Sequence, residues 1–429
     1  MLSPARLLPL LGGILPLVYG LPTTSPSVVL PPTEDPFYSA PNGFESTLPG
    51  TILRLRPAPG NLTALVSNAS AAYNIVYRTT DSQYHPSWAV TTVFIPTNPS
   101  TGSDNRTALL SYQIAYDSND LDASPSYTMY SSPPTDVSLA LSQGWYVNVP
   151  DYEGPLASFT AGVQSGHATL DSIRSILYSA SNPRVTQFHA LGPATTRTAL
   201  WGYSGGALAS EWATELQNQY APELTLAGAA LGGLTPNITN VMNTVTGTLS
   251  AGLVPEAILG IASQYPVTYD FLISQLNPTG PYNGTTFLAA RNLTLSESEL
   301  FFAGQNIYNY FVNGSDTFQD PRVQYVLNRD GYMGYHGVPQ LPVYAYKAIN
   351  DEVSPIRDTD VLLARYCGVG ANILYERNTV GGHSADQING HAAALTFVAA
   401  VLEDRYASLY KTEGCTFRNV TVNVTSSVF

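Results

Sequence analysis

Hydrophobic positions along the chain repeat with two different periods. Residues 72–94 alternate between polar and apolar or β-branched side chains, which is typical of paired strands. Further along, short apolar segments predict strands, and segments with apolar residues at helical spacing predict helices. The expected strands are 108–116, 145–149, 198–201, 224–231, 343–348 and 373–377, and the expected helices are 138–143, 167–181, 206–219, 358–366 and 389–406. Strands that alternate with helices predict an α/β fold with a mostly parallel sheet and helices on both faces.

One long interval, residues 235–330, breaks this alternation. It has few strand signals, and it holds three helix-like pieces at 255–262, 269–275 and 297–310. Because the interval lies between two expected strands, we predict an inserted helical cap over the sheet. The α/β core is then expected in residues 51–234 and 331–415.

The N-terminal segment has the layout of a secretory signal peptide. Arg6 precedes an apolar stretch at residues 7–18, and the small residue Gly20 ends the segment before polar Thr, Ser and Pro residues. The stretch covers about twelve residues, fewer than the ~20 needed to span a bilayer. We therefore expect a signal peptide at 1–20, an extended Pro/Ser/Thr-rich leader at 21–50, no integral membrane segment, and a C-terminal tail at 416–429.

Composition supports a globular secreted protein. The chain has 429 residues, of which 44% are hydrophobic and 11% charged, against roughly 25% charged in average proteins. Such a chain is not intrinsically disordered, because disorder requires few apolar residues and much charge. The net charge of −13 disfavours nucleic acid and anionic membranes as partners.

The Asn-x-Ser/Thr sequons and the two cysteines are also typical of a secreted protein. Cys367 and Cys415 can form a single disulfide, the alternative being two free buried thiols, and so few cysteines argue against a structural zinc site. Nine sequons favour N-glycosylation. They are Asn61, Asn68, Asn105, Asn237, Asn283, Asn292, Asn313, Asn419 and Asn423.

The segment Gly202-Tyr203-Ser204-Gly205-Gly206 fits the pattern G-x-S-x-G between an expected strand and an expected helix. This context is typical of a nucleophile elbow, in which small neighbours let the strand and helix pass closely. Ser204 is the predicted nucleophile. The backbone N–H of Gly205 is the first predicted oxyanion donor.

A serine hydroxyl needs a base, and the base needs an acid to orient it. We predict His383, in a glycine-rich loop after the strand 373–377, as the base. His336 and His391 are the other downstream histidines, and His391 lies within an expected helix.

Asp351, which follows the strand 343–348, is the predicted acid. Its neighbour Glu352 is the rival carboxylate, whereas Asp358 and Asp360 fit charges at a helix N-terminus. A second oxyanion donor is expected in the loop after the strand 108–116, where the N–H of Asp117 is the candidate. An ordinary turn is the alternative there, because Asp and Ser favour turns.

Several motifs occur together in one order between residues 72 and 415. They are Tyr116-Asp117-Ser118, Ser124-Pro125-Ser126-Tyr127, the segment 149–155, Ala161-Gly162 with Gly166, the segment 170–174, the elbow, and Asp351-Glu352-Val353 with Pro355. In this combination the chain resembles the fungal secretory lipase family, of the lipase A type known from yeast. The resemblance implies an α/β-hydrolase fold with a helical cap and a Ser-Asp-His triad. It supports Ser204, Asp351 and His383, with Asp117 and Gly205 as the oxyanion hole.

Two departures from the yeast pattern affect the expected specificity. The segment Asp122-Ala123-Ser124-Pro125 lacks the cysteine of the yeast enzyme. Because 14 residues follow Cys415, we expect a shorter C-terminal flap. The family also includes deacetylases of fungal metabolites, such as trichothecene esterases. A shorter flap suits a bulky acetylated substrate as well as a triglyceride.

We therefore expect a secreted carboxylic ester hydrolase that works through an acyl-enzyme, with triacylglycerol lipase as the leading hypothesis. The alternative is an esterase or deacetylase of short-chain esters or acetylated metabolites. A non-catalytic binding protein of the same fold is disfavoured, because all three triad residues are present. We expect no metal and no other cofactor, a lipid or other ester as substrate, transient contact of the aromatic cap with an oil–water interface, and a monomer.

Overall fold

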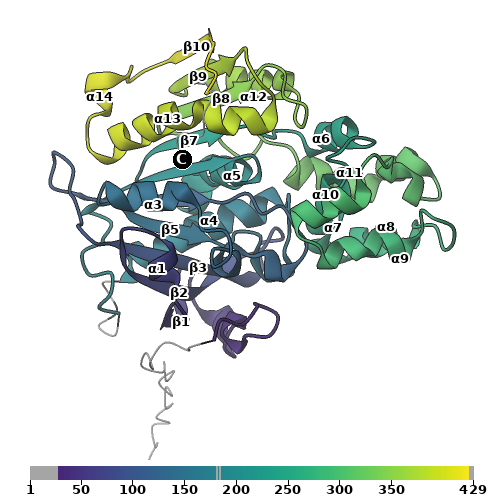
Figure 1. Cartoon of the computed structure of the whole chain (residues 1–429), viewed down its shortest axis with the longest axis horizontal. Coiled ribbons are helices and arrows are strands. Elements are labelled where there is room, and N and C mark those ends of the chain that lie inside the picture. Colours follow the sequence, from purple (N-terminus) through teal and green to yellow (C-terminus); the bar gives the residue numbers. More distant parts are fainter. Residues whose placement is uncertain (1–27, 180–181, 183–184, 425–429) are drawn as a thin grey trace, which may run out of the picture.

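The computed structural model describes residues 28–179, 182 and 185–424 of the chain (Figure 1). The predicted signal peptide at 1–20 lies outside the described residues. The described residues form one ten-stranded sheet in the order β1-β2-β3-β5-β4-β6-β7-β8-β9-β10. The strands are β1 (Ile52–Pro57), β2 (Ala69–Thr80), β3 (Pro86–Pro96), β4 (Thr107–Gln113), β5 (Tyr146–Pro150), β6 (Thr196–Tyr203), β7 (Leu226–Gly232), β8 (Val343–Ala348), β9 (Ile373–Asn378) and β10 (Cys415–Val420).

Strand direction divides the sheet into two parts. Strands β1, β2, β3 and β5 pair antiparallel, and from β5 to β10 every pair is parallel. Parallel strands need crossover connections, which usually are helices. The predicted mostly parallel α/β class is confirmed.

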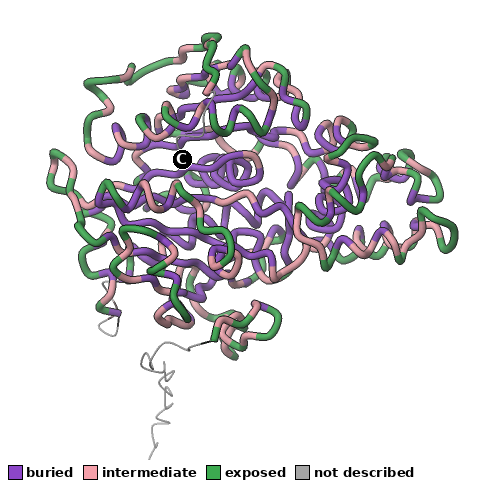
Figure 2. Tube along the Cα trace, in the orientation of Figure 1, coloured by how far each residue is buried: buried purple, intermediate pink, exposed green. Residues whose placement is uncertain are grey.

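Helices cover both faces of the sheet, and alternate residues of each strand pack against the helices of opposite faces. In β6, Leu200 belongs to the core beneath α4 (Gly162–Leu177), α5 (Gly205–Tyr220) and α12 (Ile356–Gly368), whereas Trp201 belongs to the core beneath α3 (Thr135–Ser142) and α13 (His383–Leu402). Successive strand side chains point to opposite faces, so a strand covered on both sides is mostly apolar. The buried trace accordingly runs through the sheet and its covering helices (Figure 2).

The first described residues do not form the extended leader that we expected. Residues 36–38 and 44–46 are two short 3-10 turns, η1 and η2. Phe37 and Phe44 pack against the cluster of Leu53, Val76 and Val90. The Trp88 indole N–H donates to the Tyr38 carbonyl at 2.8 Å. Aromatic burial against β1–β3 holds this segment to the sheet.

A group of helices lies between β7 and β8 in the chain, to one side of the sheet (Figure 1). α7 is buried on nearly every side and forms its centre, as expected for a helix that is apolar all round. The single helix expected at 297–310 is two pieces, because Gly304 (φ 71°) interrupts it. The helices are α6 (Ile238–Val245), α7 (Leu253–Ser263), α8 (Pro266–Ser274), α9 (Gly284–Phe287), α10 (Leu295–Phe302) and α11 (Pro321–Asp330).

Polar contacts attach this helical group to the core. Ser118 Oγ donates to the Leu293 carbonyl at 2.7 Å, and the Asn119 N–H donates to Glu256 of α7 at 2.7 Å. At the other end, Asp330 accepts the Val163 N–H at 2.8 Å. The loop after β4 and the start of α4 therefore lie directly against the helical group.

The C-terminal segment corrects the tail that we expected at 416–429. Residues 415–420 form β10, which pairs parallel with β9 and extends the sheet. The expectation was wrong for residues 416–420 because a sequon-rich, polar segment carries little strand signal, while an open sheet edge offers it backbone partners.

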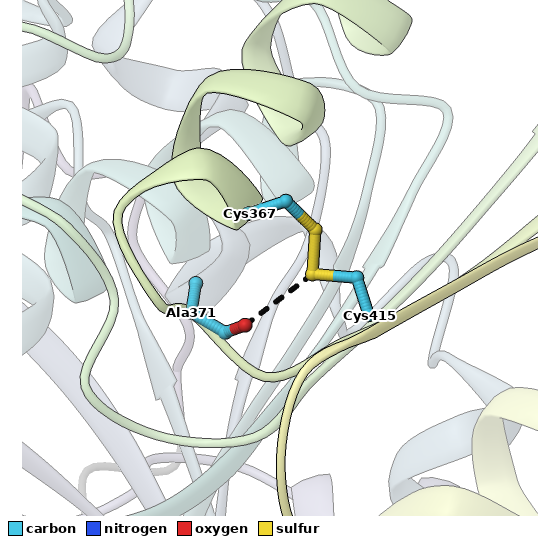
Figure 3. Close-up of a disulfide and its surroundings, with 3 residues drawn as sticks. All are labelled: Cys367, Ala371 and Cys415. Carbon is cyan, nitrogen blue, oxygen red and sulfur yellow. Dashed lines mark hydrogen bonds between the residues drawn. A yellow bond between two sulfur atoms is a disulfide. The ribbon is translucent and has the colours of Figure 1, made fainter.

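A disulfide joins Cys367 at the end of α12 to Cys415 at the start of β10 (Figure 3). The predicted pairing is confirmed, with a Cα–Cα distance of 6.1 Å and a sequence separation of 48 residues. The cross-link holds the edge strand against the helix that covers the neighbouring strands.

Within the described part of the chain, we find no helix of the length and hydrophobicity that crossing a membrane requires. All nine sequon asparagines belong to the described residues. Seven are exposed, and the side chains of Asn237 and Asn283 cap the N-termini of α6 and α9. Their glycosylation stays a prediction.

We expect replacement of both cysteines, C367S/C415S, to lower the free energy of unfolding by about 2–4 kcal/mol, because the cross-link removes chain entropy from the unfolded state. Urea unfolding of the purified variant, followed by tryptophan fluorescence, measures this loss. An unchanged unfolding midpoint would contradict it.

Candidate functional site

Ser204 occupies the sharp turn between β6 and α5. Its backbone has φ 53° and ψ −121°, a conformation that non-glycine residues adopt only where the surroundings enforce it. A Cβ on Gly202 would lie 2.2 Å from the Gly206 carbonyl carbon and oxygen. Glycine at both positions thus allows the strand and helix to approach closely enough to hold Ser204 in the turn.

His383 reaches Ser204 from another element. Its Nε2 lies 2.8 Å from Ser204 Oγ. The structure corrects the loop that we expected around this residue, because α13 begins at His383 and not near residue 389. The Glu352 carboxylate accepts the His383 backbone N–H at 2.8 Å and Tyr203 donates its hydroxyl to the His383 carbonyl at 2.5 Å. These bonds stabilise the first turn of α13. The glycines before His383 had predicted a loop at this position.

Asp351 lies on the other side of the imidazole. Its Oδ2 is 2.8 Å from His383 Nδ1, and its Oδ1 accepts the N–H groups of Val353 and Ser354 at 2.9 and 2.8 Å. Burial alone would raise the pKa of Asp351. The His383 hydrogen bond and the Lys347 charge outweigh burial and hold the pKa well below its usual value.

The other candidates for base and acid lie elsewhere. Glu352 bonds to the backbone of His383 and not to its ring. His336 pairs with Glu215, and His391 pairs with Asp136. Asp358 accepts from the Asn240 amide of α6, and Asp360 pairs with Arg377 of β9. Ser204, His383 and Asp351 are thus the residues that the structure brings into one chain of hydrogen bonds.

Asp117 follows β4 and borders Ser204, as the sequence predicted. The backbone of Asp117 has a φ of 47°, and 4% of the residue's surface is exposed to solvent. Among the described residues, its backbone N–H donates no hydrogen bond. The N–H of Gly205 belongs to the first turn of α5, where helical N–H groups lack intrahelical partners. Two unpaired N–H groups next to a serine hydroxyl can bind a negatively charged oxygen.

The Asp117 side chain packs against the elbow. Burial, together with the negative charge of Glu299, raises the pKa of its carboxyl to about 7. A Cβ on Gly205 would lie 1.9 Å from Asp117 Oδ1. Asp117 therefore fits its position because residue 205 is glycine.

Two cavities of very different size meet at Ser204. The larger one has a volume of about 930 Å³ and opens over Ser204 and His383. Its lining combines hydroxyl, amide and carboxyl side chains with apolar ones such as Met129, Leu295 and Ile388. The smaller one has a volume of about 20 Å³ and lies between the elbow and the helical group. Its apolar lining comes from Phe159, Leu208, Ile238, Val241, Leu253, Ala257 and Val353.

Two features of the site were not expected from sequence. Lys347, buried in β8, lies 2.9 Å from Asp351 Oδ2. At the far wall of the large cavity, Asp136 accepts a hydrogen bond from Tyr112 and pairs with His391. A charged residue inside the buried strand 343–348 is the signal that could have identified Lys347. The Asp136 cluster joins three separate elements and has no local signal.

Comparisons with known proteins identify the family of this chain. The sequence profile of the Secretory lipase family matches residues 130–413. Trichothecene C-3 esterase of Fusarium sporotrichioides is 50% identical, with 95% of this chain and 92% of that protein covered. Lipase 1 of Candida albicans is 35% identical, with 91% and 84% covered.

Among solved structures, lipase A of Candida antarctica superimposes with a TM-score of 0.81 at 27% identity, over 92% of this chain and 91% of that one. The fold is therefore the predicted α/β-hydrolase fold. The family match and the likeness to named lipases and an esterase indicate a hydrolase of carboxylic esters that uses a serine. The chain belongs to the secretory lipase family.

Proposed function

We propose that Ser204, His383 and Asp351 form the catalytic triad, and that the first half-reaction forms an acyl-enzyme. His383 Nε2, 2.8 Å from Ser204 Oγ, takes the hydroxyl proton while Oγ attacks the ester carbonyl carbon. The tetrahedral intermediate then expels the alcohol oxygen, which receives the same proton from His383. Asp351 keeps Nδ1 protonated and stabilises the imidazolium through the bond at 2.8 Å.

In the second half-reaction, water replaces the alcohol. His383 takes a proton from a water molecule, whose oxygen attacks the acyl carbon. The second tetrahedral intermediate expels Ser204 Oγ, which regains its proton from His383. The products are the carboxylic acid and the free enzyme. Each step uses residues of this chain, and we propose no metal or other cofactor.

The backbone N–H groups of Gly205 and Asp117 are the proposed oxyanion hole. Both residues line the small cavity beside Ser204. Among the described residues, neither backbone N–H donates a hydrogen bond to another backbone group. Fixed donors of this kind stabilise the charge that develops on the carbonyl oxygen in the transition state. The positive end of the α5 dipole adds to this stabilisation.

The unequal cavities beside Ser204 carry our proposal for the substrate. An ester places its acyl group on one side of the nucleophile and its alcohol on the other. The apolar cavity of about 20 Å³ accommodates a group of about methyl size, which fits an acetyl group. The larger cavity of about 930 Å³, with both polar and apolar lining residues, is as large as a site for a drug-sized molecule.

We therefore propose an esterase of short-chain esters of a bulky alcohol that carries both polar and apolar groups. This choice favours the alternative to a triacylglycerol lipase, since a fatty acyl chain has no matching space in the apolar cavity. Similarity to the Fusarium trichothecene C-3 esterase at 50% identity supports a trichothecene-like alcohol. Similarity to Candida lipases at about a third identity keeps triglyceride hydrolysis as the competing outcome.

The name of the Secretory lipase family supports the expectation that the chain is secreted. We propose that the chain is secreted after removal of residues 1–20, that its exposed sequons carry glycans, and that it acts as a monomer. The helices between β7 and β8 act as a cap, because residues of α6 and α7 line the acyl cavity. For a soluble short-chain ester we expect no requirement for an oil–water interface.

Ser204→Ala should remove activity, and the wild type should prefer short acyl groups. In a panel of p-nitrophenyl esters from acetate to palmitate, we expect kcat/KM to be highest for acetate and to fall steeply with chain length. Emulsified triglyceride should be hydrolysed poorly, with no increase in rate at emulsion formation. Retained activity in Ser204→Ala contradicts the mechanism, and a long-chain preference contradicts the substrate class.

Gly205→Ala should lower kcat/KM about 100-fold, the usual order for a lost oxyanion donor, because the added methyl group displaces Asp117. Gly368→Ala is the matched control, since a Cβ at that glycine meets no atom within 4 Å. Both variants are assayed with p-nitrophenyl acetate, and circular dichroism checks their folding. Equal activity of the two variants would contradict the proposal that Asp117 and Gly205 together form the oxyanion hole.

Enlarging the acyl cavity should change the chain-length preference. Ile238→Ala removes three carbon atoms from its wall, so we expect kcat/KM for butyrate to rise about 10-fold relative to acetate. Ile261→Ala in α7 is the matched control, because Ile261 is equally buried but does not line this cavity. If both variants keep the wild-type butyrate-to-acetate ratio, the cavity does not hold the acyl group.

A further inference from the structure

Lys347 contacts the carboxylate oxygen that His383 also contacts. Its side chain is fully buried, and Nζ lies 2.9 Å from Asp351 Oδ2 and 2.6 Å from the Leu234 carbonyl. Lysine is almost never fully buried without a partner. The other residues of β8 are apolar or tyrosine. Strand β8 thus holds the lysine in contact with the proposed catalytic acid.

Burial of this ammonium group is unfavourable on its own. Burial lowers the pKa of Lys347, while the negative charges of Asp351, Asp358 and Asp386 limit the fall. Replacing a buried ion pair with apolar side chains often leaves stability unchanged or increases it. Stability alone therefore does not account for a lysine at this position.

The position of Lys347 has a defined electrostatic consequence. His383 and Lys347 contact the same oxygen at 2.8 and 2.9 Å, so the two cations would be within the distance of about 6 Å over which charges strongly affect protonation. A neighbouring cation disfavours the imidazolium. It also neutralises the carboxylate that would otherwise favour the imidazolium. Lys347 therefore changes the electrostatic surroundings of the imidazole through the carboxylate that both residues contact.

The other groups near this pair act in the opposite sense. Asp351 is in direct contact with both residues. Asp358 of α12 and Asp386 of α13 act on Lys347, Asp386 also acts on His383, and Glu352 contacts the His383 backbone. The Tyr203 ring lies 5.3 Å from the His383 ring. All of these groups are acids or a phenol, and the whole chain carries −13. Lys347 offsets this negative surrounding at the catalytic base.

We propose that Lys347 is a positioning residue that partly neutralises Asp351, so that the enzyme hydrolyses esters at lower pH than it would with an uncharged residue at this position. The inference rests on the triad roles proposed above. It goes beyond them because it assigns the pH range of the reaction to a residue that never touches the substrate.

The test is the pH dependence of kcat/KM with p-nitrophenyl acetate. The ascending limb reports deprotonation of the essential base of the free enzyme. We expect Lys347→Met and Lys347→Gln to move this limb to higher pH by about one unit, with an approximately tenfold loss of kcat/KM on the acidic side. Gln can still donate a hydrogen bond, so it separates the lysine charge from its hydrogen bonds.

Two control variants separate the local charge from a general effect. Lys347→Arg restores the cation and should keep the wild-type limb. Arg377 lies opposite Lys347 in the β8–β9 register and pairs with Asp360, so Arg377→Met removes a cation in the same row without touching Asp351. It should leave the limb in place. The proposal is overturned if Met and Gln leave the limb unchanged, or if Arg377→Met moves it equally.

A measurement on the wild type does not depend on the folding of any variant. The chain contains two lysines, Lys347 and the exposed Lys411, so selective ¹³Cε-lysine labelling gives two assignable NMR signals. We expect Lys347 to stay charged across the ascending limb, and a neutral amine there would overturn the proposal. Activity that survives in Ser204→Ala contradicts the proposed triad, whereas an inactive Ser204→Ala with an unmoved limb in the Lys347 variants contradicts this inference alone.

Discussion

The close approach of β6 and α5 at Ser204 is the constraint on which the site depends. The approach requires glycine at 202, where a Cβ would lie 2.2 Å from the Gly206 carbonyl. Glycine at 206 lets α5 also lie close to β4, since a Cβ there would lie 2.0 Å from the Gln113 carbonyl. The turn forces Ser204 into a backbone conformation with positive φ. In return, it raises the hydroxyl above the carboxyl ends of the strands and directs the first N–H of α5 towards the same point. The loops after β4, β8 and β9 can then supply their residues around one atom.

The chain of contacts from Ser204 through His383 and Asp351 ends at Lys347. Four residues from three parts of the sequence thus form one buried electrostatic unit, with Asp351 fully hydrogen-bonded at both oxygens. Low dielectric surroundings strengthen each of these interactions and make an unpaired member costly. The parallel order β6-β7-β8-β9 makes this possible, because it brings the ends of these strands to one edge.

The helical insertion determines what the site can accept. Its helices α6 and α7 close the apolar side next to Ser204, leaving about 20 Å³. The opposite side is lined by the loop after β4, the region of α3, the start of α13 and α10 of the insertion. It is wide and carries both polar and apolar side chains. In our proposal the hydrolytic chemistry resides in the core, while substrate size depends on the insertion. One α/β-hydrolase core can therefore serve relatives named as lipases and as esterases.

The sequence by itself determined the alternation of strands and helices, the class of the sheet and the three residues most suited to nucleophile, base and acid. These features depend on local patterns: the period of apolar residues, the glycines around Ser204, and the positions of Asp351 and His383 after strands. The strand 343–348 was predicted with the bounds that β8 has in the structure. Short-range sterics and burial fix such features, so they are visible in the chain.

Tertiary structure alone decided the rest. The strand at 415–420 exists because the open edge of β9 supplies backbone partners, and α13 begins at His383 because Glu352 and Tyr203 bind its first turn. The Lys347–Asp351 contact and the two unequal cavities depend on distances between segments far apart in sequence. No local pattern encodes such distances, because they follow from how the helices and strands pack around the whole core.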